Sequence, residues 1–458
     1  MAHLRREHVV GIRTDLPSCK VRVGRLISYP CDNLCVLSDP TTTRSRQCFV
    51  ETTKSNHSLV AYDVSNDGTL LALAENDPTG NSSSLVSLYS LHVSTTPKKI
   101  TCSKKKVIRI ERSRILHISL VNSTHVLVLG AAPEYSLTLW STGATSANGS
   151  LIGTPTKGTS SAGTKHPGAC LASIKLATPS GKRIYRADVS PKEDDAGNTL
   201  LCVTGDGVLR LFRLSTANNT FRPATVNLKR KQQNYIAQKW LSSGQIALGT
   251  DSGEILIVEH NSTQSVLKLP EPCTAVTCLG ESSKGHLIVG SDKASMHLYE
   301  ASQDVEARFA LNTSISLATT NDTGRAGTTI TSLSTSMEGN EEVVYAATSD
   351  NRLTKVPLGS ALEKSCSPEI QPAIPTFLST KESSCTHSMD TCLWSPLIAV
   401  SSSAVPQNNC VQIWNYRTRE LEASKRFGSD CPIQAICFHP SSFQLVVGSN
   451  DKLIACDL

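Results

Sequence analysis

Leu201-Cys-Val-Thr-Gly-Asp-Gly-Val-Leu-Arg-Leu-Phe212 is a phrase that this chain repeats in several variants. Two or three apolar residues lead into a turn of small residues and Asp, and alternating apolar residues follow. The Asp-Gly pair tolerates positive φ and caps its own backbone, so the phrase predicts a strand, a tight turn and a second strand. The phrase returns as Ile246-Ala-Leu-Gly-Thr-Asp-Ser-Gly-Glu-Ile-Leu-Ile-Val258, Leu287-Ile-Val-Gly-Ser-Asp-Lys-Ala-Ser-Met-His-Leu298, Val344-Tyr-Ala-Ala-Thr-Ser-Asp-Asn-Arg-Leu353 and Leu445-Val-Val-Gly-Ser-Asn-Asp-Lys-Leu-Ile454.

The spacing of these hairpins favours one architecture. β-hairpins that recur every forty to sixty residues or so are typical of a β-propeller, with one sheet in each blade. An alternating apolar run precedes each phrase, and weaker units of the same kind span Leu59–Leu91, Leu116–Trp140 and Cys392–Trp414, with a further hairpin at Leu26–Leu37. The Trp-Asp ending of a WD repeat is mostly missing, and Trp414-Asn415 comes nearest to it. We therefore predict an all-β, WD40-type β-propeller built from degenerate repeats.

The count of hairpin units predicts the domain organisation. Seven units fall in residues 1–360, enough for a closed seven-bladed propeller, and we expect the N-terminal strands to close it by pairing with the last blade. Residues 361–390 contain three prolines and no convincing hairpin, so they are predicted as a linker. Two further units in 391–458 would form part of a second propeller or closing blades. The Gly-, Ser- and Thr-rich stretch 141–183 is predicted to be a long inserted loop.

Composition argues against several classes of protein. No apolar run reaches the length that a transmembrane helix needs, and the N-terminus lacks the apolar segment of a secretory signal. The 16 cysteines include no Cys-x-x-Cys pair, which favours reduced intracellular thiols. Gly153–Thr159 resembles a phosphate-binding loop but lacks the Lys-Ser/Thr that should follow its second Gly. We predict a non-enzymatic protein with no catalytic, cofactor-binding or metal-binding residues, since propellers usually bind rather than catalyse.

Four aspartates occupy the same place in the repeated hairpins, and we interpret them as turn residues rather than ligands. At that place an Asp side chain can accept a hydrogen bond from a neighbouring backbone N–H. These residues are Asp206, Asp251, Asp292 and Asp350.

Two basic runs are candidates for a docking surface. Lys98–Arg114 carries eight positive charges against one negative charge, and Lys229-Arg-Lys231 is shorter. Val107, Ile108 and Ile110 look like strand positions, so one interpretation is an edge strand whose Lys and Arg face water. The other is a patch, formed by Lys104, Lys105, Lys106, Arg112 and Arg114, that docks on acidic tubulin. A nucleic-acid partner is not expected, because the net charge is only +6 and no aromatic residues interleave with the basic ones.

Several collinear segments carry a resemblance to a known family. The most specific is Gln233-Asn-Tyr-Ile-Ala-Gln-Lys-Trp240 followed by Gln245–Glu254, and the others in chain order are His8–Thr14, Tyr29–Val36, Leu200–Gly207, Val411–Glu422, His439–Ser441 and Val446–Gly448. On these residues the chain resembles the cilia- and flagella-associated protein 57 family of ciliary WD-repeat proteins.

The resemblance implies a cytoskeletal scaffold of the axoneme in cilia or flagella. Members of the family carry two propellers and a long coiled coil, and help to anchor and regulate inner dynein arms on doublet microtubules. The sequence shows no heptad repeat. The alternative is a nuclear or nucleolar WD-repeat scaffold in a ribonucleoprotein assembly, which would use the basic runs Lys104–Arg114 and Lys229–Lys231 on RNA phosphates.

Overall fold

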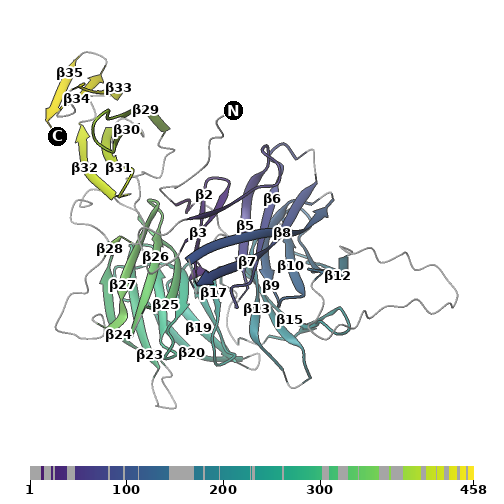
Figure 1. The fold of residues 1–458 in the computed structure, drawn as a ribbon. Coiled ribbons are helices and arrows are strands. Elements are labelled where there is room, and N and C mark those ends of the chain that lie inside the picture. Colours follow the sequence, from purple (N-terminus) through teal and green to yellow (C-terminus); the bar gives the residue numbers. More distant parts are fainter. Residues whose placement is uncertain are drawn as a thin grey trace, which may run out of the picture.

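The structure, a computed structural model, consists of antiparallel β-sheets. It describes residues 12–457 except 15–21, 39–46, 144–169, 229–232, 302–308, 318–327, 360–370, 373–384, 404–408, 428–432 and stretches of one to three residues. Every named element within the described residues is a β-strand, and the strands form nine sheets in which spatial order follows chain order or its reverse (Figure 1). No helix in this part of the chain is both long enough and apolar enough to span a membrane.

The strands of the first five sheets are as follows. The first sheet holds β1 (Arg22–Val23), β2 (Ile27–Cys31), β3 (Leu34–Ser38) and β4 (Cys48–Glu51). The second holds β5 (Ser58–Val64), β6 (Leu70–Asn76), β7 (Ser84–Thr95) and β8 (Lys98–Ile110). The third holds β9 (Ile115–Leu120), β10 (His125–Gly130), β11 (Ser136–Ser141) and β12 (Cys170–Lys175). The fourth holds β13 (Ile184–Glu193), β14 (Thr199–Gly205), β15 (Val208–Ser215) and β16 (Thr220–Ala224), and the fifth β17 (Tyr235–Trp240), β18 (Ile246–Thr250), β19 (Glu254–Glu259) and β20 (Ser262–Lys268).

The remaining four sheets continue in chain order. The sixth holds β21 (Val276–Glu281), β22 (Leu287–Ser291), β23 (Ser295–Ala301) and β24 (Phe309–Ser316), and the seventh β25 (Ile330–Glu338), β26 (Glu341–Thr348), β27 (Arg352–Pro357) and β28 (Gln371–Pro372). The eighth holds β29 (Cys385–Thr391), β30 (Leu397–Ser403), β31 (Asn409–Asn415) and β32 (Glu420–Phe427), and the ninth β33 (Ile433–Phe438), β34 (Gln444–Ser449) and β35 (Leu453–Asp457). Each predicted hairpin is present, which confirms the propeller fold.

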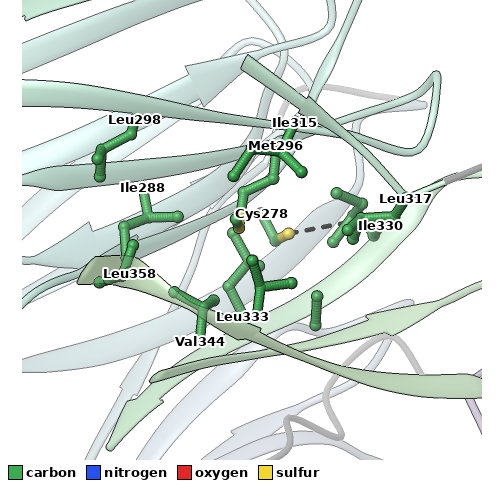
Figure 2. Packing of buried hydrophobic residues seen from close by; sticks show 12 residues of the cluster. Cys278, Ile288, Met296, Leu298, Ile315, Leu317, Ile330, Leu333, Val344 and Leu358 are labelled. Atoms are coloured by element: carbon green, nitrogen blue, oxygen red, sulfur yellow. Dashed lines mark hydrogen bonds between the residues drawn. The ribbon is translucent and has the colours of Figure 1, made fainter. Parts of the chain in front are cut away.

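Seven apolar cores hold the first seven sheets together as a ring. Six of them lie between two sheets that are consecutive in the chain, from the first and second sheets through to the sixth and seventh. Figure 2 shows the core between the sixth and seventh sheets, where Cys278, Ile288 and Met296 meet Ile330 and Val344. These cores bury both faces of each sheet, so every blade depends on its two neighbours.

The seventh core closes the ring by joining the first sheet to the seventh. Tyr29 and Val36 of the first sheet pack against Tyr345 of the seventh. The amide and hydroxyl of Thr14 also donate hydrogen bonds to Asn351 Oδ1, at 3.2 and 2.7 Å. All four strands of the seventh sheet come from β25 to β28. The expectation that N-terminal strands would pair into the last blade is therefore wrong for the described strands, because closure uses packing between sheets.

The glycine before the turn in two of the repeats is explained by the approach of the next blade. A Cβ atom on Gly249 would lie 2.3 Å from Cγ1 of Val276, which begins the next sheet. A Cβ on Gly290 would lie 2.5 Å from Cys278 Sγ and 3.0 Å from Cγ2 of Ile330, the first residue of the seventh sheet. Only glycine leaves space for such contacts, so in these two repeats the phrase encodes the spacing between blades as well as the hairpin.

Two segments depart from the sequence-based prediction. Part of the predicted inserted loop 141–183 is β12, which pairs with β11 as the outer strand of the third sheet, while 144–169 lies outside the described residues. The predicted linker 361–390 contains β28 and the start of β29. The eighth and ninth sheets share a core of their own and are drawn outside the ring in Figure 1. The division into 1–360 and 391–458 stays a prediction.

Candidate docking surface on the second blade

Strand β8, which carries most of the larger basic run, is the outer strand of the second sheet. Among the strands described it pairs with β7 alone. Ile108 packs into the core that faces the third sheet, whereas Cys102 packs into the core that faces the first. The change of face occurs at a register shift, where Leu88 pairs with Lys106 and Tyr89 pairs with Lys104. This bulge sends neighbouring lysines toward different blades.

Lys104 points toward the first blade and ends a chain of hydrogen bonds. Its ammonium donates to Thr53 Oγ1 at 2.8 Å and lies 5.8 Å from the centre of the Tyr89 ring. The Thr53 hydroxyl lies 2.7 Å from Ser87 Oγ. Ser87 Oγ donates to the carboxylate of Glu75 at 3.2 Å, and the Thr53 amide donates to the same carboxylate at 2.8 Å.

Glu75 is the residue in this cluster that sequence reasoning missed. It is completely buried, in a strand whose other members are nearly all apolar. A buried carboxylate is tolerated when hydrogen-bond donors surround it, and here they come from both the first and the second blade. The cluster therefore fastens the segment after β4 to the second sheet. In the sequence, the signal for this site was a charged residue within an otherwise apolar run.

Lys106 points the other way, toward the third blade. Its ammonium donates to the carbonyl oxygen of Ser141 at 2.8 Å, and burial lowers its pKa. Two of the three consecutive lysines thus support contacts between blades. Lys104 and Lys105 are exposed, as the edge-strand interpretation expects, whereas Lys106 is half-buried and departs from it. Reversing the charge of Lys104–Lys106 would therefore disturb the propeller as well as any docking patch.

Only part of the basic run is presented to solvent. Lys105 lies in the bulge and is exposed, as are Val107 and Arg109, and we call these three residues the outer-strand basic surface. Lys104 is exposed as well, but its ammonium is bonded to Thr53. Arg114, between β8 and β9, is exposed too. Arg112 and the run Lys229–Lys231 lie outside the described residues. Within the described residues no group of three His, Cys, Asp or Glu is placed to hold a metal ion. The surface offers positive charge on an outer strand for binding.

The four turn aspartates make hydrogen bonds within their own blades. Asp292 is the best supported, because its carboxylate accepts from the Thr274 amide at 2.9 Å, the Thr274 hydroxyl at 2.6 Å and the Ala275 amide at 3.1 Å. Asp251 accepts from the side-chain amide of Asn234 at 2.7 Å.

The other two turn aspartates follow the same principle with different partners. Asp206 accepts from the Tyr185 hydroxyl. Asp350 accepts from the Thr348 hydroxyl at 2.5 Å and pairs with Arg352. For three of the four, the donor comes from the beginning of a sheet's first strand or from the residues just before it, rather than from the turn itself.

Comparison with known proteins gives two relatives with the same name. The chain is 28% identical over 274 residues to "Cilia- and flagella-associated protein 57 A" of Tetrahymena thermophila, covering 57% of this chain and 20% of that protein. It is 22% identical over 500 residues to "Cilia- and flagella-associated protein 57" of Mus musculus, covering 97% of this chain and 36% of that protein. The chain thus spans about a third or less of the length of these relatives. No protein-family model matches it.

A solved structure also resembles the chain. It is the crystal structure of Chaetomium thermophilum Raptor, with a TM-score of 0.40 and 15% identity, covering 76% of this chain and 28% of that one. A likeness at this TM-score supports no argument about function.

Proposed function

We propose that this chain, a homologue of the proteins named Cilia- and flagella-associated protein 57, is a non-enzymatic scaffold of the ciliary or flagellar axoneme. The observation that carries the proposal is the similarity to the mouse protein across 97% of the chain. The ring of seven blades supports it, because a rigid propeller presents its loops and outer strands as contact surfaces while the sheets position them. The partners that we propose are components of the inner dynein arms and doublet microtubules.

The outer-strand basic surface is our candidate for the microtubule contact. Lys105 and Arg109 are exposed on an outer strand. An acidic partner such as tubulin would attract them over roughly a Debye length, about 8 Å at physiological ionic strength. The alternative of a ribonucleoprotein scaffold has less support, because both relatives are named as ciliary proteins. In addition, the ammonium groups of Lys104 and Lys106 donate hydrogen bonds to neighbouring blades, which makes them less available to RNA phosphates.

Localisation tests the scaffold proposal directly. A fluorescent fusion of the chain, expressed in ciliated cells, should give signal along the axoneme that persists after the membrane is removed with detergent. Signal confined to the nucleus or nucleolus would contradict the proposal.

Co-sedimentation with microtubules tests the contact surface. The double change Lys105→Glu and Arg109→Glu should weaken binding several-fold at low salt, and binding of the unchanged protein should fall as salt is raised. Arg213→Glu with Arg222→Glu is the matched control, since it reverses two exposed arginines that face each other on β15 and β16 of the fourth blade. Equal loss of microtubule binding in both double variants, or no loss in Lys105→Glu with Arg109→Glu, would rule out the outer-strand basic surface as the microtubule contact.

A further inference from the structure

Two cysteines from neighbouring blades share a hydrogen bond. Cys48 begins β4, the outer strand of the first sheet, and Cys102 lies in β8, the outer strand of the second. These two strands are in contact. Both cysteines are half-buried, and both pack against the apolar core between the two sheets.

The strand registers place the two thiols on the same core. Cys48 lies opposite Leu37 on β3, and Cys102 lies opposite Leu91 on β7. Both leucines belong to the core between the first and second sheets. A third cysteine of this core, Cys35, is completely buried.

Cys48 and Cys102 differ in acidity because they share a hydrogen bond. The bond from Cys102 lowers the pKa of Cys48 to about 7, against the opposing effect of burial. The same bond raises the pKa of Cys102, and burial raises it further. Near neutral pH, Cys48 is therefore partly thiolate while Cys102 keeps its proton. An attacking thiolate beside a protonated thiol is the arrangement that redox-active cysteine pairs require.

We propose that Cys48 and Cys102 form an oxidative modification site, at which a hydroperoxide such as hydrogen peroxide joins the first and second blades through a disulfide. Cys48 thiolate attacks one peroxide oxygen, the O–O bond breaks, and Cys48 sulfenic acid and hydroxide form. Cys102 sulfur then attacks Cys48 sulfur. The S–O bond breaks and the oxygen leaves as water, taking up the Cys102 proton. Overall, two thiols and one hydrogen peroxide give one disulfide and two waters.

The inference does not rest on the proposed function. It requires only the packing of β4 against β8. The proposed disulfide would link the first and second blades, and we propose none for the other six contacts between blades.

Peptide mapping of the whole chain tests the proposal. The protein is treated with hydrogen peroxide, free thiols are blocked with iodoacetamide, and peptides are analysed without reduction. We expect a linked peptide containing Cys48 and Cys102 as the first disulfide to appear, and its loss after dithiothreitol. Cys273 is the internal control, since it is also half-buried but its sulfur contacts Ser291 Oγ, at 3.3 Å. Oxidation of Cys273 before Cys48, or a disulfide that includes Cys35, would overturn the proposal.

Two single variants separate the roles of the thiols. Cys102→Ser should accumulate sulfenic acid at Cys48, which dimedone traps, whereas Cys48→Ser should leave Cys102 unlabelled at neutral pH. The rate of Cys48 alkylation by iodoacetamide in the unchanged protein should rise with a midpoint near pH 7. The measurements on the unchanged protein need no variant to fold. A midpoint near the ordinary thiol pKa of about 8.5 would contradict the assignment of Cys48 as the attacking thiol.

Discussion

Replacing Asp292 by Ala tests whether the turn aspartates stabilise the blades in which they lie. Its carboxylate accepts two hydrogen bonds from Thr274 and one from the Ala275 amide, and the side chain is 18% exposed. Asp251 is the matched control, because it has the same place in the preceding repeat but one side-chain partner, Asn234. The substitution removes the acceptor and leaves the Thr274 and Ala275 donors without it.

The expected magnitude follows from the number of donors and their exposure. A hydrogen bond to a charged acceptor contributes about 1.5–3 kcal/mol, and water entering the vacated space recovers part of the loss. We expect Asp292→Ala to lower the free energy of unfolding by about 2–3 kcal/mol and Asp251→Ala by about 1 kcal/mol. The unfolding entropy of a ring of about 350 residues is roughly 0.7 kcal/mol/K, so these losses correspond to about 3–4 °C and 1–1.5 °C in Tm.

Thermal unfolding followed by circular dichroism measures this difference, and its pH dependence checks the cause. Burial raises the pKa of Asp292, but the hydrogen bonds from Thr274 and Ala275 outweigh it and hold the pKa below its usual value. The stabilisation is therefore present above the unfolded pKa of about 3.9 and is lost as the pH falls through the lower folded pKa. The gap in Tm between the unchanged protein and Asp292→Ala should narrow below about pH 4. Equal losses for both variants at pH 7 would refute the reasoning.

Three further substitutions probe the ring by thermal unfolding. Gly249→Ala should lower stability by about 1–3 kcal/mol, because its Cβ would lie 2.3 Å from a Val276 methyl carbon; unchanged Tm would show that the blades can separate freely. Asn351→Ala should lower the free energy of unfolding by about 2 kcal/mol and Asn351→Gly by about 1 kcal/mol. Both variants lose the hydrogen bonds from Thr14, but only alanine is strained at a φ of 61°, so equal losses would show that backbone strain at this position contributes nothing. Glu75→Gln should lower the free energy of unfolding by about 1–3 kcal/mol, because the new side-chain NH2 would face the Thr53 amide and the Ser87 hydroxyl, which are donors themselves. Unchanged stability would mean that the carboxylate is not needed there.

The hairpins were predictable because their causes are local. In Asp32-Asn33, for example, Asp32 adopts a φ of 52°, and the flanking residues alternate between the two faces of one sheet. Turn chemistry and a period of two act within about ten residues, so they are visible in a single stretch of sequence. The same reasoning missed β12, an outer strand in a Gly- and Ser-rich region, because its residues are only half-buried or exposed and carry little apolar alternation.

The sequence by itself therefore determined the repeated hairpins, their turns and the propeller fold that they build. Only the tertiary structure decided how the ring closes and which basic residues face water. Thr14 and Asn351 are 337 residues apart, and no local period relates them. Lys104, Lys105 and Lys106 are adjacent and identical, yet a one-residue bulge directs the first to Thr53 and the last to Ser141, and only the last of the three is half-buried. Side-chain periodicity shows that a residue lies on a face, whereas the neighbouring blade that meets that face determines what the residue does.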